Sequence, residues 1–173
     1  MNRKFLGIML LLIAAGAIFY GWLGGFSGTT VTSTNSQQLF VAGKPFRGHT
    51  KDEVLGNTFR QVAQVLDEKQ LDGVPANIYY NNPDEASDTI SAFIGVLVPD
   101  TTQQLPGGFE FRTVPGGRQV LRAEVNAHYM LAPNKLYEAL FNHAEKNNLK
   151  LEPFYVEWFP EDKKGVVEVP VQK

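Results

Sequence analysis

The chain has 173 residues, of which 43% are hydrophobic and 12% aromatic, so it has room for one globular domain and a short additional segment. It carries 16 Lys and Arg residues against 18 Asp and Glu residues and shows no basic stripe of the kind that phosphate binding requires, which argues against a nucleic-acid partner. Cysteine is absent and the three histidines are scattered singly, so we expect no disulfide, thiol nucleophile, metal site or cofactor.

An uncharged apolar segment, residues 5–26, follows Arg3 and Lys4 at the N-terminus. About twenty residues at 1.5 Å per residue cross a hydrocarbon layer of ~30 Å. Tyr20 and Trp22 lie near the far end of the segment, where aromatic rings favour the membrane interface. The charge bias predicts a single-pass membrane protein whose C-terminal part is extracytoplasmic, and periplasmic in a bacterium. A cleaved signal peptide is the alternative, because it has the same charged start.

The chain is expected to divide into three parts, of which residues 1–26 are the membrane anchor or signal segment. Residues 27–38 (SGTTVTSTNSQQ) are polar and uncharged, a composition typical of a solvated linker. The folded domain should therefore span residues 39–173. Its first predicted strand is Leu39–Gly48.

A helix is expected next. Thr50 and Glu53 match the capping-box pattern, in which the two side chains bond backbone N–H groups at the start of a helix. Apolar residues recur at three- and four-residue spacing from Leu55 to Leu66, and the helix should end near Gln70. Two strands separated by a turn at Asn82-Pro83-Asp84 should follow, Ala76–Asn81 and Ile90–Pro99.

The second half of the chain shows the same order of elements. Pro-Gly-Gly at residues 106–108 and 115–117 marks turns, which favour antiparallel hairpins. A second helix is predicted from Pro133 to about Asn147. The expected strands of this half are Phe109–Val114, Val120–Tyr129, Phe154–Phe159 and Val166–Val171.

An aromatic strand that ends in a proline-acidic turn occurs once in each half, at Ile78–Glu85 and at Tyr155–Asp162. The two prolines, Pro83 and Pro160, are about 77 residues apart, which is too long for a solenoid repeat and suggests an internal duplication. The predicted fold class is therefore α+β, with duplicated βαββ units related by a pseudo-twofold axis. An antiparallel sheet would pack with two helices and be preceded by one transmembrane helix.

Five short motifs follow one another along the chain: Ile78–Pro83, Thr113–Arg118, His128-Tyr129 with the helix from Pro133, Tyr155–Asp162 and Val166–Val171. In order and spacing they resemble the GyrI-like effector-binding family, the ligand-binding domain found alone or fused to AraC- and MerR-type regulators. The resemblance covers Leu39–Val171. It implies a stand-alone, membrane-anchored form of that domain.

The chain departs from the family's pattern at three places. Asn126–Tyr129 replaces a glycine-containing turn, and Trp158-Phe159 replaces a tyrosine-aliphatic pair. Where a helix-turn-helix segment would precede the domain, the chain has its apolar segment. A DNA-binding regulator is therefore not expected, and inhibition of DNA gyrase would require the opposite side of the membrane.

The resemblance implies a cleft between the two repeats that binds small amphipathic ligands, often cationic or aromatic. Glu157 matches the family's pocket glutamate. A carboxylate among aromatic rings attracts a cation through its charge, and each ring face adds about 0.5–2 kcal/mol. Candidate walls are Tyr79, Tyr80, Phe93, Tyr129, Phe154, Trp158 and Phe159, of which strand alternation lets about half face a cleft. The ligand-binding residues expected are Glu157, Trp158, Tyr155, Tyr80, Tyr129 and Phe93.

Other interpretations stay open. The aromatic residues could be ordinary core, and Glu157 could be a solvated strand residue or form a structural salt bridge with Arg112 or Arg122. Some relatives of the family are hydrolases, in which case Glu157 would activate water with Tyr129 or Tyr80 as partner. No catalytic residue is assigned, since no triad or paired carboxylate is visible. Small-molecule binding is the expected function, ahead of a hydrolase or a protein-partner adaptor whose partner is unknown.

Overall fold

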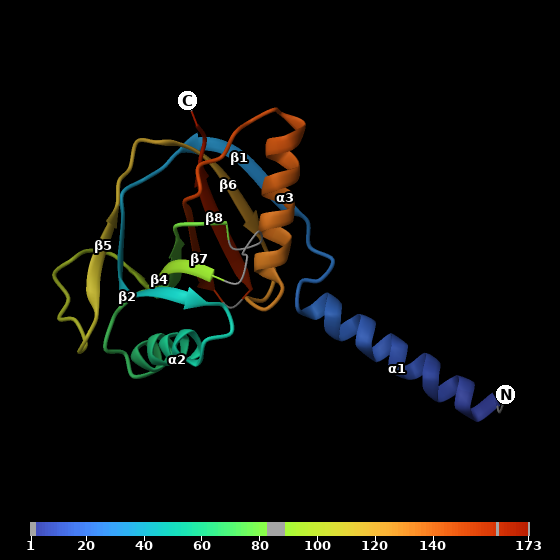
Figure 1. Ribbon diagram of the computed structural model, residues 1–173. Helices are drawn as coiled ribbons and strands as arrows, with labels where there is room; N and C mark the ends of the chain where they lie inside the picture. The colour runs from blue at the N-terminus through green and yellow to red at the C-terminus, as the bar shows by residue number, and fades with distance from the viewer. Residues whose placement is uncertain (1–2, 83–88, 162, 173) are drawn as a thin grey trace.

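The computed structural model describes residues 3–82, 89–161 and 163–172. Within these residues it has one eight-stranded sheet, two helices packed on the sheet and a separate N-terminal helix (Figure 1). The elements in chain order are α1 (Arg3–Trp22), β1 (Thr29–Asn35), β2 (Leu39–His49), α2 (Glu53–Asp67), β3 (Val74–Tyr79), β4 (Thr89–Val98), β5 (Glu110–Val114), β6 (Gln119–Val125), α3 (Ala132–Lys146), β7 (Tyr155–Glu161) and β8 (Lys164–Pro170).

Helix α1 extends away from the folded part (Figure 1). By length and composition, its stretch Lys4–Trp22 is apolar enough to cross a membrane. The prediction of an apolar N-terminal helix is confirmed, and its insertion into a membrane stays a prediction.

The sheet has the strand order β1-β6-β8-β7-β3-β4-β2-β5, and every neighbouring pair is antiparallel. The predicted α+β class with an antiparallel sheet is therefore confirmed. Strands β3 and β7 pair at the centre, where Asn77 lies opposite Glu157. On one side of this centre follow β4 and β2, and on the other follow β8 and β6. The internal duplication stays a prediction.

Both packed helices cover the same face of the sheet. Helix α2 contacts β2, β3 and β4 and buries Val62 and Val65, whereas α3 contacts β1, β6 and β8 and buries Leu136 and Leu140. Each helix thus covers one outer half of the sheet. The central strands β3 and β7 lie between the two helices and form the floor of a trough.

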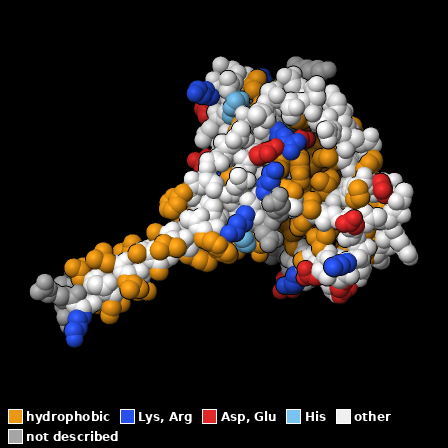
Figure 2. Space-filling model, turned by 180° about the vertical axis from the view of Figure 1, so that it is seen from behind, with side chains coloured by type: hydrophobic (Ala, Val, Ile, Leu, Met, Phe, Trp, Pro, Cys, Tyr) orange, Lys and Arg blue, Asp and Glu red, His pale blue; other side chains and the backbone are white. Residues whose placement is uncertain are grey.

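The opposite face of the sheet carries a second apolar cluster. It contains Val41, Ala76, Ile78, Phe93, Val114, Val156, Trp158 and Val166. Three arginines lie over aromatic rings here: the Cζ atoms of Arg112, Arg118 and Arg122 are 5.3, 4.8 and 5.3 Å from the ring centroids of Phe93, Phe154 and Trp158. Seen from behind, hydrophobic side chains gather in a hollow of the folded part beside basic and acidic side chains (Figure 2). Arginine side chains therefore shield part of this face from water.

Residues 29–35 correct one prediction. They form the edge strand β1, which pairs with β6 from Thr29↔Val125 to Asn35↔Gln119. The expected solvated linker over residues 27–38 is therefore wrong for this stretch, and the folded part begins before Leu39. Most β1 side chains are exposed, so a polar Thr- and Ser-rich sequence suffices for a strand that gains mainly backbone hydrogen bonds.

The boundaries of other elements also differ from those predicted. The N-cap of α2 is Asp52 rather than Thr50, and its Oδ1 accepts a hydrogen bond of 2.9 Å from the Val54 N–H. Helix α2 ends at Asp67 instead of near Gln70. Strand β6 ends at Val125, four residues before the predicted end, because the chain turns there toward α3. Of the predicted turn at 82–84, residues 83 and 84 lie outside the described residues.

A candidate ligand cavity around Glu157

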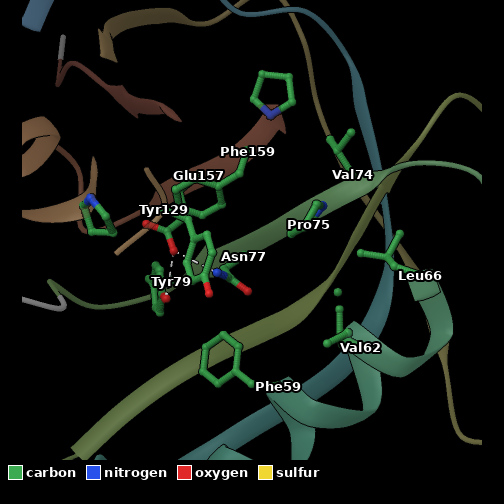
Figure 3. A pocket seen from close by; sticks show the side chains of 14 residues that line it. Phe59, Val62, Leu66, Val74, Pro75, Asn77, Tyr79, Tyr129, Glu157 and Phe159 are labelled. Carbon is green, nitrogen blue, oxygen red and sulfur yellow. Dashed lines mark hydrogen bonds between the residues drawn. The ribbon is translucent and has the colours of Figure 1, made fainter. Parts of the chain in front are cut away.

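A cavity of about 670 Å³ lies above the central strands, between α2 and the start of α3 (Figure 3). Helix α2 and strand β3 provide Phe59, Val62, Ala63, Leu66, Val74, Pro75, Asn77 and Tyr79; the rest of the lining is Gly95, Tyr129, Pro133, Glu157, Phe159 and Pro160. Its volume is within the range of cavities that hold drug-sized molecules. The position follows from the fold, because the trough between the two helices is the uncovered part of this face.

The walls of the cavity are mainly apolar. Phe59, Val62 and Leu66 lie three and four residues apart in α2, so one stripe of the helix faces the trough (Figure 3). Phe159 provides an aromatic ring from β7 on the other side. An apolar molecule that enters would gain roughly 25 cal/mol for each Å² of apolar surface removed from water.

Glu157 is the carboxylate of the cavity, and its side chain is only 4% exposed. Its Oε1 accepts hydrogen bonds from Asn77 Nδ2 at 2.8 Å and from the Tyr79 hydroxyl at 3.0 Å. Its Oε2 accepts one of 3.3 Å from the Tyr137 hydroxyl on α3. The side chain is thus held by neutral donors from β3 and α3, and no Lys or Arg side chain is among its recorded partners in the described residues.

Burial raises the pKa of Glu157 above its ordinary value of 4.5, while the hydrogen bonds from Asn77, Tyr79 and Tyr137 act in the opposite direction. Burial also raises the pKa of Tyr79 well above 10.0, and the negative charge of Glu157 adds to this shift. Tyr79 therefore keeps its proton and remains a donor. The arrangement favours a ligand that brings a positive charge, because such a charge would compensate the buried carboxylate.

Two of the six predicted binding residues, Glu157 and Tyr129, line the cavity. Tyr155 faces the same side of the sheet but is buried beneath α3, with its ring centroid 5.8 Å from that of Tyr137 and 6.2 Å from that of Phe141. It contributes to the core and supports Tyr137 from behind.

The other three predicted residues, Trp158, Tyr80 and Phe93, lie on the opposite face. Trp158 and Phe93 belong to the second apolar cluster, and Tyr80 packs against Phe154 at 5.8 Å between ring centroids. Successive side chains of a strand point to opposite faces, so the neighbour of Glu157 on β7 must point away from the cavity. The prediction for these three residues is corrected accordingly.

Sequence reasoning missed Asn77, Tyr137 and the apolar stripe of α2. Asn77 is an amide in an otherwise apolar strand, a signal that a buried polar partner is required. Tyr79 and Phe159 were among the candidate walls and do line the cavity.

The structure also contradicts the alternative roles of Glu157. It is not a solvated strand residue, because it is buried. Nor does it form the expected salt bridge: Arg112 pairs with Glu110, and Arg122 pairs with Glu124 and Glu168.

The structure is similar to three solved structures. They are integron cassette protein VCH_CASS2 from the mobile metagenome of Vibrio cholerae (15% identity, covering 84% of this chain and 96% of that chain, TM-score 0.61), SAV2435 bound to tetraphenylphosphonium (9% identity, 83% and 94%, TM-score 0.59), and the C-terminal domain of EcmrR (13% identity, 85% and 98%, TM-score 0.55). At these identities the likeness shows the fold alone. It supports the predicted GyrI-like effector-binding fold. No family model and no curated protein matches the sequence.

Proposed function

We propose that this protein is a membrane-tethered, extracytoplasmic domain that binds a small amphipathic cation in the cavity above β3 and β7. One observation carries the proposal: Glu157 is a buried carboxylate within an apolar cavity of about 670 Å³, held only by neutral donors among its recorded partners. Such a charge is costly to bury alone, and a bound cation would offset that cost.

The apolar walls define the rest of the ligand. Phe59, Phe159 and Tyr129 offer ring surfaces, and aliphatic side chains of α2 complete the wall. A cation that carries bulky apolar groups fits this combination better than a small hydrated ion, because its apolar groups leave water on binding. Tetraphenylphosphonium, the ligand of SAV2435 in one similar structure, is a cation of this kind.

The tether and its orientation rest on α1 and on the charges around it. Two basic residues precede the apolar stretch Lys4–Trp22 or stand at its start, which favours a cytoplasmic N-terminus. The two predicted βαββ halves would meet at β3 and β7, so the proposed binding cleft lies between repeats related by a pseudo-twofold axis.

A hydrolase is the second candidate. The favouring observation is that Glu157, whose pKa is raised, lies within hydrogen-bond distance of two phenol groups, those of Tyr79 and Tyr137. A carboxylate with a raised pKa is a suitable general base, and a phenol can donate a proton. In this case a bound ester or amide would be consumed, whereas a binding protein would release its ligand unchanged.

The test uses a fragment from Ser27, which retains β1, titrated calorimetrically with tetraphenylphosphonium and with the neutral triphenylphosphine oxide. Glu157→Gln should weaken binding of the cation about ten- to a hundredfold and leave binding of the neutral compound nearly unchanged. The matched control is Glu168→Gln, which removes the other buried carboxylate, on the opposite face, and should change neither affinity. Equal affinity of the wild-type and Glu157→Gln proteins for the cation would refute the proposal.

A further inference from the structure

The junction between α1 and the folded part is held by specific contacts. The His128 N–H donates a hydrogen bond of 2.9 Å to the Leu23 carbonyl oxygen, and Lys135 Nζ donates one of 3.1 Å to the Ser27 carbonyl oxygen. Gly24 packs so closely on the chain after β6 that a Cβ atom there would lie 2.4 Å from the Asn126 carbonyl oxygen. Its φ of 80° also favours glycine. The segment between α1 and β1 therefore fixes the folded part close to the end of the helix.

The segment that receives these contacts also forms part of the cavity. It connects β6 to α3 and includes Tyr129, which lines the cavity and is nevertheless 56% exposed. Pro133, in the first turn of α3, lines the cavity as well. Tyr129 thus lies at the mouth of the cavity, one residue from the hydrogen bond between His128 and Leu23.

Large apolar side chains are exposed around this junction. Trp22 is 62% exposed, Phe26 75% and Met130 69%, and with Tyr129 we call these four residues the junction patch. Hydrophobic side chains continue from α1 onto the adjoining surface of the folded part, next to basic side chains (Figure 2). Lys163, from the turn between β7 and β8, places its Nζ 3.6 Å from the centroid of a Trp22 ring. Exposed aromatic and aliphatic residues beside lysines are typical of a surface that contacts lipid headgroups.

We propose that the junction patch rests on the membrane surface, so that the cavity takes its amphipathic cation directly from the headgroup layer of the bilayer. The inference rests on the proposed function, since it requires both the tether and the ligand. If α1 spans the bilayer, Trp22 at its end lies at the interface, and the fixed junction brings Tyr129 and Met130 to the same level. Amphipathic cations concentrate in that layer, with apolar groups among the acyl chains and charge among the headgroups.

The first experiment measures the depth of the patch with the full-length protein in vesicles of phosphatidylcholine and phosphatidylglycerol. Because the chain has no cysteine, single substitutions Met130→Cys and Glu145→Cys each give one site for a fluorescent label. Glu145 is exposed in the last turn of α3, at the end away from α1, and is the control (Figure 1). Lipids with a nitroxide at the headgroup should quench the label at position 130 several-fold more than that at position 145. Equal quenching would overturn the inference.

The second experiment measures the route of the ligand. Met130→Asp adds a charge to the patch at a residue that does not line the cavity. Uptake of tetraphenylphosphonium from preloaded vesicles should become several-fold slower, while the affinity of the soluble fragment for the dissolved cation stays unchanged. An unchanged uptake rate would refute the membrane route and leave the proposed function intact. Absence of cation binding to the fragment, or loss of the full-length protein from the vesicles, would refute the proposed function and with it this inference.

Discussion

Asn77 and Glu157 are 80 positions apart in the chain and face each other across the central strand pair, with Asn77 Nδ2 donating to Glu157 Oε1 at 2.8 Å. Each residue comes from a different half of the chain. The pair therefore joins the two halves at the point where the candidate ligand cavity has its charged group. Stability and binding should respond together to changes here.

The stability of the protein should depend on the charge of Glu157. Burial raises the pKa of this carboxyl, so its unfavourable effect is absent below the ordinary pKa of 4.5 and develops as pH rises through the folded-state pKa. Glu157→Gln should therefore raise the free energy of unfolding at pH 7, by on the order of 1 kcal/mol. The gain should shrink toward pH 4. Urea denaturation of both proteins from pH 4 to 8 measures the difference, in which the titration of Glu168 cancels. A gain that is the same at pH 4 and pH 7 would contradict this account.

Tyr137 should tune the pH at which the cation is released. Its hydroxyl donates to Glu157 Oε2 and lowers the pKa of that carboxyl, so Tyr137→Phe should raise the pKa further. Since the cation needs the ionised carboxylate, affinity should then be lost at a higher pH than in the wild-type protein. Calorimetric titration across pH gives the two midpoints. Tyr80→Phe removes a hydroxyl on the opposite face and should leave the midpoint where it is.

Filling the cavity should block binding without unfolding the protein. Ala63 lines the cavity from α2 and is exposed enough to accept a larger side chain, so Ala63→Phe should place a ring where the ligand would lie. We expect affinity to fall tenfold or more and stability to change by less than about 0.5 kcal/mol. The control is Gln64→Phe, which adds the same ring to an exposed position outside the cavity lining. If both variants bind like the wild type, the ligand occupies another site.

Strand β1 should be required for a well-behaved fragment. A fragment from Leu39 would lack β1 and leave the backbone N–H and C=O groups of β6 unpaired along one edge of the sheet. We expect a fragment from Ser27 to unfold cooperatively and remain monomeric, and the shorter one to be less stable and to self-associate. Urea melts and size-exclusion chromatography distinguish the two. Equal stability would mean that β1 adds nothing to the fold.

The orientation in the membrane can be tested with reporters fused after Lys173 in a bacterial host. The basic residues before the apolar stretch predict an active alkaline phosphatase fusion and a dark GFP fusion. The reverse pattern would show the folded part to be cytoplasmic. Retention of the full-length mass in the membrane fraction would distinguish an anchor from a cleaved signal peptide.

The sequence predicted most elements because periodic apolar residues and turn motifs record local preferences. Helix α3 and strands β2, β4 and β8 lie within one or two residues of their predicted bounds. The predicted site was less accurate, because adjacent strand residues such as Glu157 and Trp158 face opposite sides and composition alone does not say which faces a cavity. Tyr137 escaped prediction for a related reason: its contact with Glu157 depends on where α3 packs on the sheet. Strand β1 escaped because an exposed edge strand needs no apolar pattern.

The arginines over the second face of the sheet have a consequence for crowding. Helices cover only one side of this sheet, and on the other side the guanidinium groups of Arg112, Arg118 and Arg122 act as a charged roof over Phe93, Phe154 and Trp158. Proteins confined to a bilayer diffuse in two dimensions and meet one another often. Mutual repulsion between such roofs would keep neighbouring copies apart, so the aromatic rings beneath would not become an adhesive surface.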